Sequence, residues 1–143
     1  MIEQIPNEPG IYILHILIKE DLNLEIGKLG QRFFPKGEYF YVGSAQGGLR
    51  KRIAHHLAKD KENFWHIDYL LSEEAVELKG IYWEVGAKKG EECGIALFLW
   101  SFGEGIDGFG SSDCLCESHL YRLSDEAVIN QIRKSFQSIP DGM

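Results

Sequence analysis

The chain has 143 residues, of which 44% are hydrophobic and 12% aromatic, with three cysteines and a formal net charge of -7. This composition argues against a disordered chain, against a membrane helix of ~20 apolar residues, against a secretory signal and against a disulfide framework. We therefore expect one cytoplasmic domain over residues 1–143, with no membrane contact.

The first half of the chain predicts mainly strands. Residues 10–18 and 39–43 are rich in β-branched and aromatic side chains and predict two buried strands. A short strand is expected over residues 24–29, followed by a turn at residues 35–37. The glycine-containing residues 44–48 predict a flexible loop that permits close approach to the backbone.

The middle of the chain predicts helices around one further strand. Residues 49–58 form a basic amphipathic pattern and residues 63–72 a second helix, with Phe64, Ile67 and Leu71 on one face. A strand is expected over residues 76–85. Residues 91–102 are apolar almost all round, so we expect a buried helix there.

The last part of the chain begins with a glycine-rich loop over residues 103–112. A short strand is expected over residues 119–123, and a final helix over residues 124–136 with Ser124 as its N-cap. Together these elements predict an α+β domain, in which a small, largely antiparallel sheet is flanked by helices.

Two tyrosines each lie beside a glycine on the two strongest predicted strands, in Gly10-Ile11-Tyr12 and Tyr41-Val42-Gly43. If these strands are neighbours, both tyrosines project from one face and glycine leaves room for a phosphate. A phenol has a pKa near 10, so as a general base it needs a nearby cation or hydrogen bond. Two ordinary buried strand tyrosines are the alternative.

Basic side chains are concentrated in residues 28–61, which contain eight Lys or Arg and two acids. Such a segment predicts a local phosphate-binding face on an otherwise acidic protein, although a solvated charged surface is the alternative. Within it, Arg52, His56 and Lys59 share one edge of the predicted helix. His56 could steer a proton or bind a phosphate oxygen. The candidate nucleic-acid contacts are Lys36, Gly43, Ser44, Arg50 and Lys59.

Glu92 lies in the first turn of the predicted apolar helix. One carboxylate with substrate oxygens and water is a normal set of ligands for Mg²⁺. Stabilisation by the helix dipole alone would also explain an acid at this position.

The ordered set Gly10-Ile11-Tyr12, Tyr41-Val42-Gly43-Ser44-Ala45, Arg52 and Glu92 resembles the pattern of the GIY-YIG nuclease superfamily. A more specific resemblance, over roughly residues 8–124, is to the branch called DUF123. It is carried by Ile26–Gly30, Gly48–Ile53, Phe64–Leu71, Glu92-Cys93 and Gly108–Leu120.

This resemblance implies phosphodiester hydrolysis in DNA, or alternatively RNA, with one Mg²⁺ or Mn²⁺ ion. Tyr41 would be the general base, supported by Tyr12. Arg52 would neutralise charge on the reacting phosphate, and Glu92 would hold the metal ion.

The chain departs from this pattern at two places. Some relatives carry a lysine just after the second triplet, where this chain has Ser44, so His56 or the metal would have to activate the tyrosine. Residues 13–40 form a long insertion whose basic loop could alter or block the groove. The alternative function is therefore a module that holds nucleic acid or a partner protein without cutting.

A separate possibility concerns Cys93, Cys114, Cys116 and His119. Three thiolates and one imidazole complete a tetrahedral zinc site, and a zinc-stabilised interaction domain would be a third function. Cys114 and Cys116 are more closely spaced than usual zinc ligands. The preferred interpretation is three reduced, buried cysteines that pack as small hydrophobic residues.

Overall fold

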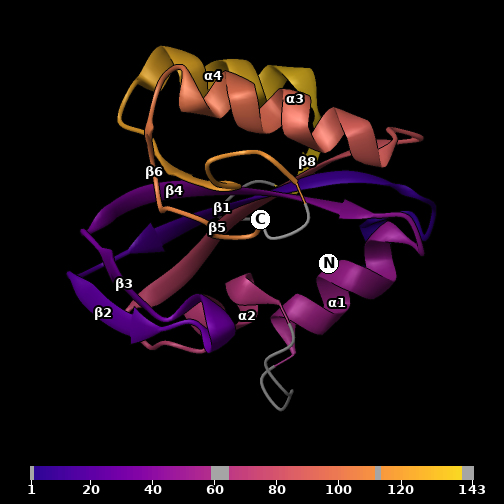
Figure 1. Ribbon diagram of the computed structural model, residues 1–143. Helices are drawn as coiled ribbons and strands as arrows, with labels where there is room; N and C mark the ends of the chain where they lie inside the picture. Colours follow the sequence, from indigo (N-terminus) through magenta and orange to yellow (C-terminus); the bar gives the residue numbers. More distant parts are fainter. Residues whose placement is uncertain (1, 59–64, 112–113, 140–143) are drawn as a thin grey trace.

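A six-stranded antiparallel sheet lies at the centre of the molecule (Figure 1). The computed structural model describes residues 2–58, 65–111 and 114–139. The strands of this sheet are β1 (Gly10–Ile18), β4 (Gly37–Ala45), β5 (Val76–Val85), β6 (Glu104–Gly105), β7 (Leu120–Arg122) and β8 (Gln137–Ile139). Their order is β6-β7-β4-β1-β5-β8, so the two strands with the Tyr-Gly triplets are neighbours.

Helices cover both faces of the sheet (Figure 1). On one face lie α3 (Lys89–Trp100) and α4 (Glu126–Ser135); on the other lie α1 (Leu49–Leu57), α2 (His66–Leu71) and the hairpin of β2 (Leu22–Glu25) and β3 (Gln31–Phe34). Two short 3-10 helices are η1 (Ile2–Gln4) and η2 (Gly27–Leu29). The predicted α+β class, a small antiparallel sheet flanked by helices, is confirmed. Of the helices described, none has the length and apolar character to span a membrane.

The central strand β1 is buried on both faces, which explains its nearly continuous apolar sequence. Ile11 and Ile13 belong to the core under α3 and α4. Tyr12 and Leu14 alternate with them and belong to the core under α1 and α2. In the register with β4, Tyr12 pairs with Gly43 and Leu14 with Tyr41, so both tyrosines lie on one face.

One edge of β4 is only partly covered. The strand β7 pairs with β4 from Tyr39 to Tyr41, and the last contact is the Val42 amide, which donates to the His119 carbonyl at 2.9 Å. Among the described residues, no strand continues this pairing along Gly43 and Ser44. Side chains from both faces of the sheet can therefore meet around this open edge.

The sequence predicted that this helix is buried all round, but α3 is buried on one face only. Glu92, Ala96 and Leu99 are buried, whereas the side chains of Leu97 and Trp100 are more than half exposed. Only one face of α3 packs against the sheet and α4, so the apolar side chains on its other face remain in solvent.

Two smaller predictions are also corrected. The helix α4 is capped by Asp125, whose carboxylate accepts a hydrogen bond from the Ala127 amide at 2.9 Å, and not by Ser124. The short strand expected over residues 24–29 is β2, which ends at Glu25 and is followed by η2.

Candidate functional site

A cavity of about 530 Å³ opens at the uncovered edge of β4. It is lined by four residues that the sequence predicted to act together: Tyr12, Tyr41, Arg52 and Glu92. These side chains come from β1, β4, α1 and α3, so the cavity unites elements from both faces of the sheet.

The two tyrosines are close neighbours, with ring centroids 6.3 Å apart. A Cβ atom on Gly43 would clash with the ring and hydroxyl of Tyr12. The glycine of the second triplet therefore makes room for the opposite tyrosine, and it also lines the cavity.

His56 does not reach the edge of this cavity but lies behind Tyr12, almost completely buried. Its Nε2 is 2.6 Å from the Tyr12 hydroxyl, and its Nδ1 is 2.9 Å from Oδ1 of Asp68, which is fully buried on α2. Of the two roles expected for His56, steering a proton and binding a phosphate oxygen, these contacts favour the first. Tyr12, His56 and Asp68 instead form a buried chain of hydrogen bonds that ends at the cavity.

The direction of this chain follows from Asp68. A carboxylate accepts, so the His56 proton lies on Nδ1, and the Nε2 atom accepts a hydrogen bond from the Tyr12 hydroxyl. Burial lowers the pKa of His56 below its ordinary value, and the hydrogen bond and charge of Asp68 oppose this shift. At neutral pH His56 is thus an uncharged imidazole that can take a proton from Tyr12.

The two tyrosines differ in what their hydroxyl groups can do. Burial raises the pKa of both phenols above the ordinary value, and the charge of Arg52 opposes the rise in each. Tyr12 has His56 as a proton acceptor. No described residue accepts a hydrogen bond from the Tyr41 hydroxyl, so Tyr41 is suited to donate into the cavity.

Arg52 is held in place from two sides. Its Nη1 donates to the Ser44 carbonyl at 2.9 Å, and its guanidinium carbon lies 4.1 Å from the centre of the Trp65 ring. A cation over an aromatic face is stabilised by the ring and kept in a defined plane. The guanidinium therefore lines the cavity in a fixed position, beside a Trp65 that the sequence did not single out.

Glu92 lies in the first turn of α3, with 8% of its surface exposed. Its Oε1 lies 3.4 Å from Nδ1 of His119. Among the described residues that line the cavity it is the one acid, and Arg52 and Lys89 are the Arg and Lys residues. One carboxylate facing a space that can also hold phosphate oxygens fits a single Mg²⁺ or Mn²⁺ ion.

His66 lines the cavity without having been predicted to do so. Its Nδ1 accepts a hydrogen bond from the Gly110 amide at 2.7 Å, and burial lowers its pKa, with a further contribution from Arg32. Gly110 has a φ of 72°, a conformation that favours glycine. This contact fixes the loop before β7 against α2.

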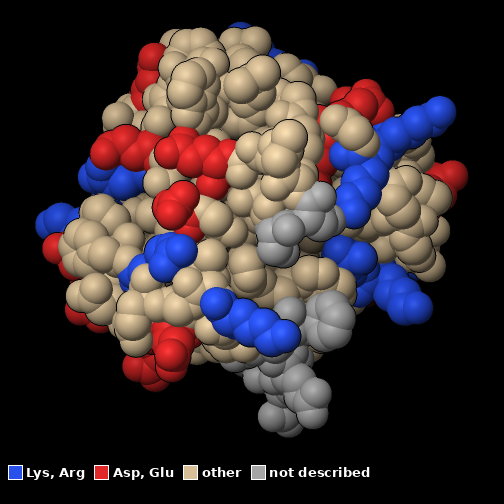
Figure 2. Space-filling model, in the orientation of Figure 1, with Lys and Arg blue, Asp and Glu red and all other residues tan. Residues whose placement is uncertain are grey.

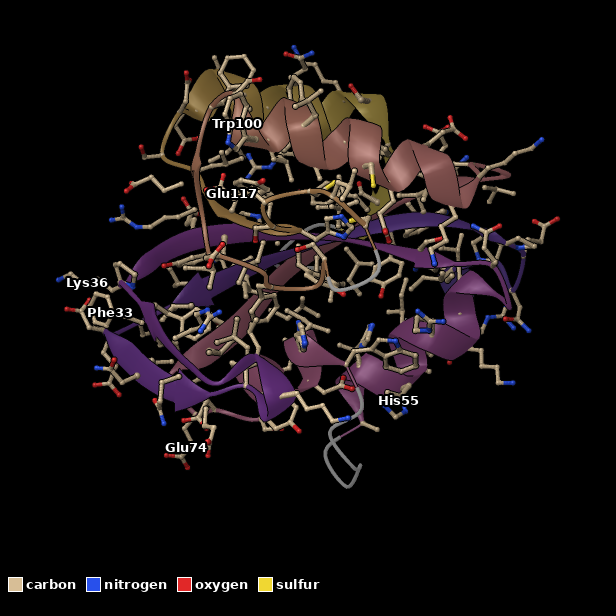
Figure 3. The ribbon with its side chains drawn as sticks, in the orientation of Figure 1. Phe33, Lys36, His55, Glu74, Trp100 and Glu117 are labelled. Atoms are coloured by element: carbon tan, nitrogen blue, oxygen red, sulfur yellow. The ribbon has the colours of Figure 1, made fainter. Side chains whose placement is uncertain are left out.

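The basic residues that the structure describes in the segment 28–61 do not form one continuous face. Gly43 and Ser44 line the cavity, but Arg50 donates to the Ile5 carbonyl at 2.7 Å. Lys36 lies at the other end of β4, roughly 26 Å along the strand; Figure 3 shows it far from His55 of α1. Lys59 is outside the described residues. Figure 2 likewise shows Lys and Arg in separate groups on this face.

The three cysteines converge although they are far apart along the chain. They are free thiols, as expected, but each is partly exposed and not fully buried; Cys116 packs against the core under α3 and α4. With His119 they offer four ligand atoms that all lie within 4.8 Å of one another. Burial and the neighbouring Cys93 raise the pKa of Cys116 to about 12, which argues against a reactive thiolate in the absence of a metal.

Comparison with known proteins identified one family. The family model described as "Domain of unknown function DUF123" matches residues 11–140. No curated protein and no solved structure matches the chain.

Proposed function

As a member of the DUF123 family, whose function is unknown, the chain has to be interpreted from its own site, and we propose that it hydrolyses phosphodiester bonds in nucleic acid, DNA in preference to RNA. The observation that carries this proposal is the convergence of Tyr12, Arg52 and Glu92 on one cavity, with a proton acceptor behind Tyr12. The proposal includes the relationship to GIY-YIG nucleases that the motifs suggest.

Tyr12, and not Tyr41, is the better general base. As the attacking water gives a proton to the Tyr12 oxygen, the Tyr12 proton passes to Nε2 of His56. The resulting imidazolium is stabilised by Asp68. This transfer avoids a free buried phenolate, which the raised pKa of Tyr12 makes costly. It also replaces the lysine that some relatives carry where this chain has Ser44.

The remaining residues of the cavity act on the phosphate. Arg52 can engage two of its oxygens and neutralise the charge that grows in the transition state. Tyr41 can donate a hydrogen bond, and Lys89 adds a second positive charge at the rim. A Mg²⁺ or Mn²⁺ ion held by Glu92 would supply charge that stabilises the leaving oxygen.

A module that binds nucleic acid without cutting it is the second candidate. It is favoured by the strong burial of both tyrosines, which raises the pKa of each phenol and opposes base catalysis. The exposed parts of the Trp65 and Arg52 pair would then serve as a surface on which a base can stack.

The two candidates are separated by an assay of the purified protein with Mg²⁺ or Mn²⁺ on duplex, single-stranded, flapped and branched DNA and RNA. The nuclease proposal predicts metal-dependent cleavage of at least one substrate. Arg52→Ala should abolish cleavage and weaken binding, while Arg133→Ala on the exposed side of α4 should change neither. Binding without any metal-dependent cleavage would favour the module.

A further inference from the structure

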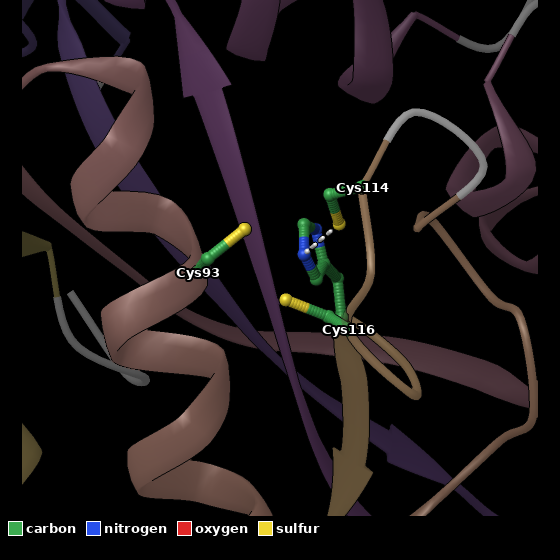
Figure 4. A group of neighbouring side chains, drawn as sticks. Cys93, Cys114 and Cys116 are labelled. Carbon is green, nitrogen blue, oxygen red and sulfur yellow. Dashed lines mark hydrogen bonds between the residues drawn. The ribbon is translucent and has the colours of Figure 1, made fainter.

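The Cys93, Cys114, Cys116 and His119 side chains form a closed set of ligands between two separate elements. Cys93 is on α3, whereas Cys114 and Cys116 lie in the segment that leads into β7 (Figure 4), and His119 directly precedes that strand. Their sulfurs and the His119 ring face a common space, with Sγ of Cys114 3.4 Å from Nε2 of His119. All four ligand atoms lie within 4.8 Å of one another.

This geometry suits a tetrahedral zinc ion. Bonds of ~2.3 Å to sulfur and ~2.0 Å to nitrogen place neighbouring ligands roughly 3.5–3.8 Å apart. The Cys114–His119 distance of 3.4 Å is already close to this range, and the other ligand atoms, all within 4.8 Å of one another, need to move only slightly to complete the site. Three thiolates and one imidazole prefer Zn²⁺ to Mg²⁺ or Mn²⁺. Four protein ligands leave no open position, as in structural zinc sites.

The second nitrogen of His119 connects this cluster with the cavity. Nε2 faces Cys114, and Nδ1 lies 3.4 Å from Oε1 of Glu92. When a metal ion binds Nε2, the ring proton must be on Nδ1, where it points to the carboxylate. A histidine that binds metal through one nitrogen and donates to a carboxylate through the other is a common arrangement that orients both groups.

We propose that Cys93, Cys114, Cys116 and His119 bind a structural Zn²⁺ ion, which holds the segment before β7 against α3 and, through His119, orients Glu92 in the cavity. Zinc binding is independent of the proposed nuclease activity. The effect on the metal ion held by Glu92 rests on that function.

The zinc site is tested on the purified full chain by its metal content and by Co²⁺ titration. The wild-type protein should contain one zinc per chain, and Co²⁺ should give the visible absorption of a tetrahedral thiolate site. Cys93→Ser and Cys114→Ser should lose both signals. A wild-type protein without zinc that shows no such absorption with Co²⁺ would overturn the site.

The link to Glu92 is tested with His119→Cys, which keeps four zinc ligands but removes the donor to Glu92. Zinc should remain bound, because four thiolates are a normal zinc set. Mn²⁺ is then titrated into the zinc-loaded protein, and the paramagnetic broadening of resonances near Glu92 is recorded. The concentration that gives half of the broadening should rise at least about tenfold relative to the wild type.

The control is Glu92→Gln, which should keep zinc and lose the paramagnetic broadening that Mn²⁺ causes near residue 92. Equal Mn²⁺ binding by wild type and zinc-loaded His119→Cys would contradict the link. Neither the zinc measurement nor the Mn²⁺ titration involves cleavage of a substrate. A protein that gives the expected results in both but cuts no substrate would therefore contradict the nuclease proposal and not the zinc site.

Discussion

The chemistry of the cavity depends on the position of one proton, on the hydroxyl of Tyr12. This hydroxyl is hydrogen-bonded to Nε2 of the neutral His56, and Nδ1 of His56 is hydrogen-bonded to Asp68. Tyr41 has the same side chain at a distance of 6.3 Å between ring centroids, but no such acceptor is found for it among the described residues. Two chemically identical groups are therefore given different roles by their surroundings.

Tyr12→Phe and Tyr41→Phe should consequently have unequal effects. Loss of the Tyr12 hydroxyl removes the proposed general base and should lower the cleavage rate by about 10²–10⁴-fold. Loss of the Tyr41 hydroxyl removes one hydrogen bond to phosphate, worth roughly tenfold. Single-turnover rates at saturating protein measure the difference. A larger loss for Tyr41→Phe would return the role of base to Tyr41.

The pH dependence of the rate tests the role of His56. Burial holds its folded-state pKa below 6.5, so the neutral, active form persists below that pH and is lost as pH falls through the folded-state pKa. The free energy of unfolding should depend on pH in the same direction. The contribution of neutral His56 is present above pH 6.5 and is lost as pH falls through the folded-state pKa, because the unfolded chain binds the proton more tightly.

Asp68→Asn removes the charge that raises the pKa of His56. The acid limb of the pH–rate profile should therefore move to lower pH, while the plateau rate falls because the imidazolium loses its stabilising partner. A purely structural role of Asp68 would lower the rate without moving the limb.

The sequence allowed only part of these roles to be predicted. Tyr12 and Tyr41 follow from their strands, and Arg52 and Glu92 from the order of the motifs. Asp68 could not be found, because its bond to His56 depends on how α1 and α2 pack. No local period connects the two residues.

At the scale of secondary structure, the elements that the sequence predicted well are those with a strong apolar pattern. The strand over residues 10–18 has the predicted bounds, since its burial on both faces leaves a continuous apolar run. The strands β3 and β8 were missed because each is short, and a short strand depends on its partner for its structure. The exposed face of α3 was missed because Leu97 and Trp100 on that face are apolar. The sequence therefore does not distinguish this face from the buried one.

The cap of α4 offers a direct test at this scale. Asp125→Ala removes the acceptor for the Ala127 amide and should lower the free energy of unfolding by about 1 kcal/mol. Ser124→Ala, one residue earlier, should change it by less than about 0.5 kcal/mol. Urea unfolding followed by circular dichroism measures both. An equal loss for the two variants would restore Ser124 as a contributor to the cap.

For the whole molecule, the arrangement of charge matters more than its sum. The chain is acidic, with a net charge of -7, yet Arg52 and Lys89 line the cavity, and Lys51 lies in the adjoining hollow beside Arg52 and Trp65. These three cations define a path across the cavity and the adjoining hollow, along which we expect a phosphate backbone to bind. Lys36, at the other end of β4, lies outside it.

Binding at different salt concentrations tests this path. Lys51→Ala should lower the slope of log affinity against log salt by about 1, because one phosphate contact is lost. Lys36→Ala, which removes the same charge far from the cavity, should leave the slope unchanged. A change only in Lys36→Ala would place nucleic acid at the β3–β4 turn.

The most direct test of the nuclease proposal is to compare cutting and binding in Glu92→Gln. This change keeps the size of the side chain but removes the charge that a divalent metal requires, while Arg52 remains to hold phosphate. If the protein is a metal-dependent nuclease, the cleavage rate should fall by several orders of magnitude, with binding retained or tightened as repulsion of phosphate is removed. Equal cleavage by the wild type and Glu92→Gln, or equal inactivity with equal binding on every substrate, would contradict the nuclease proposal.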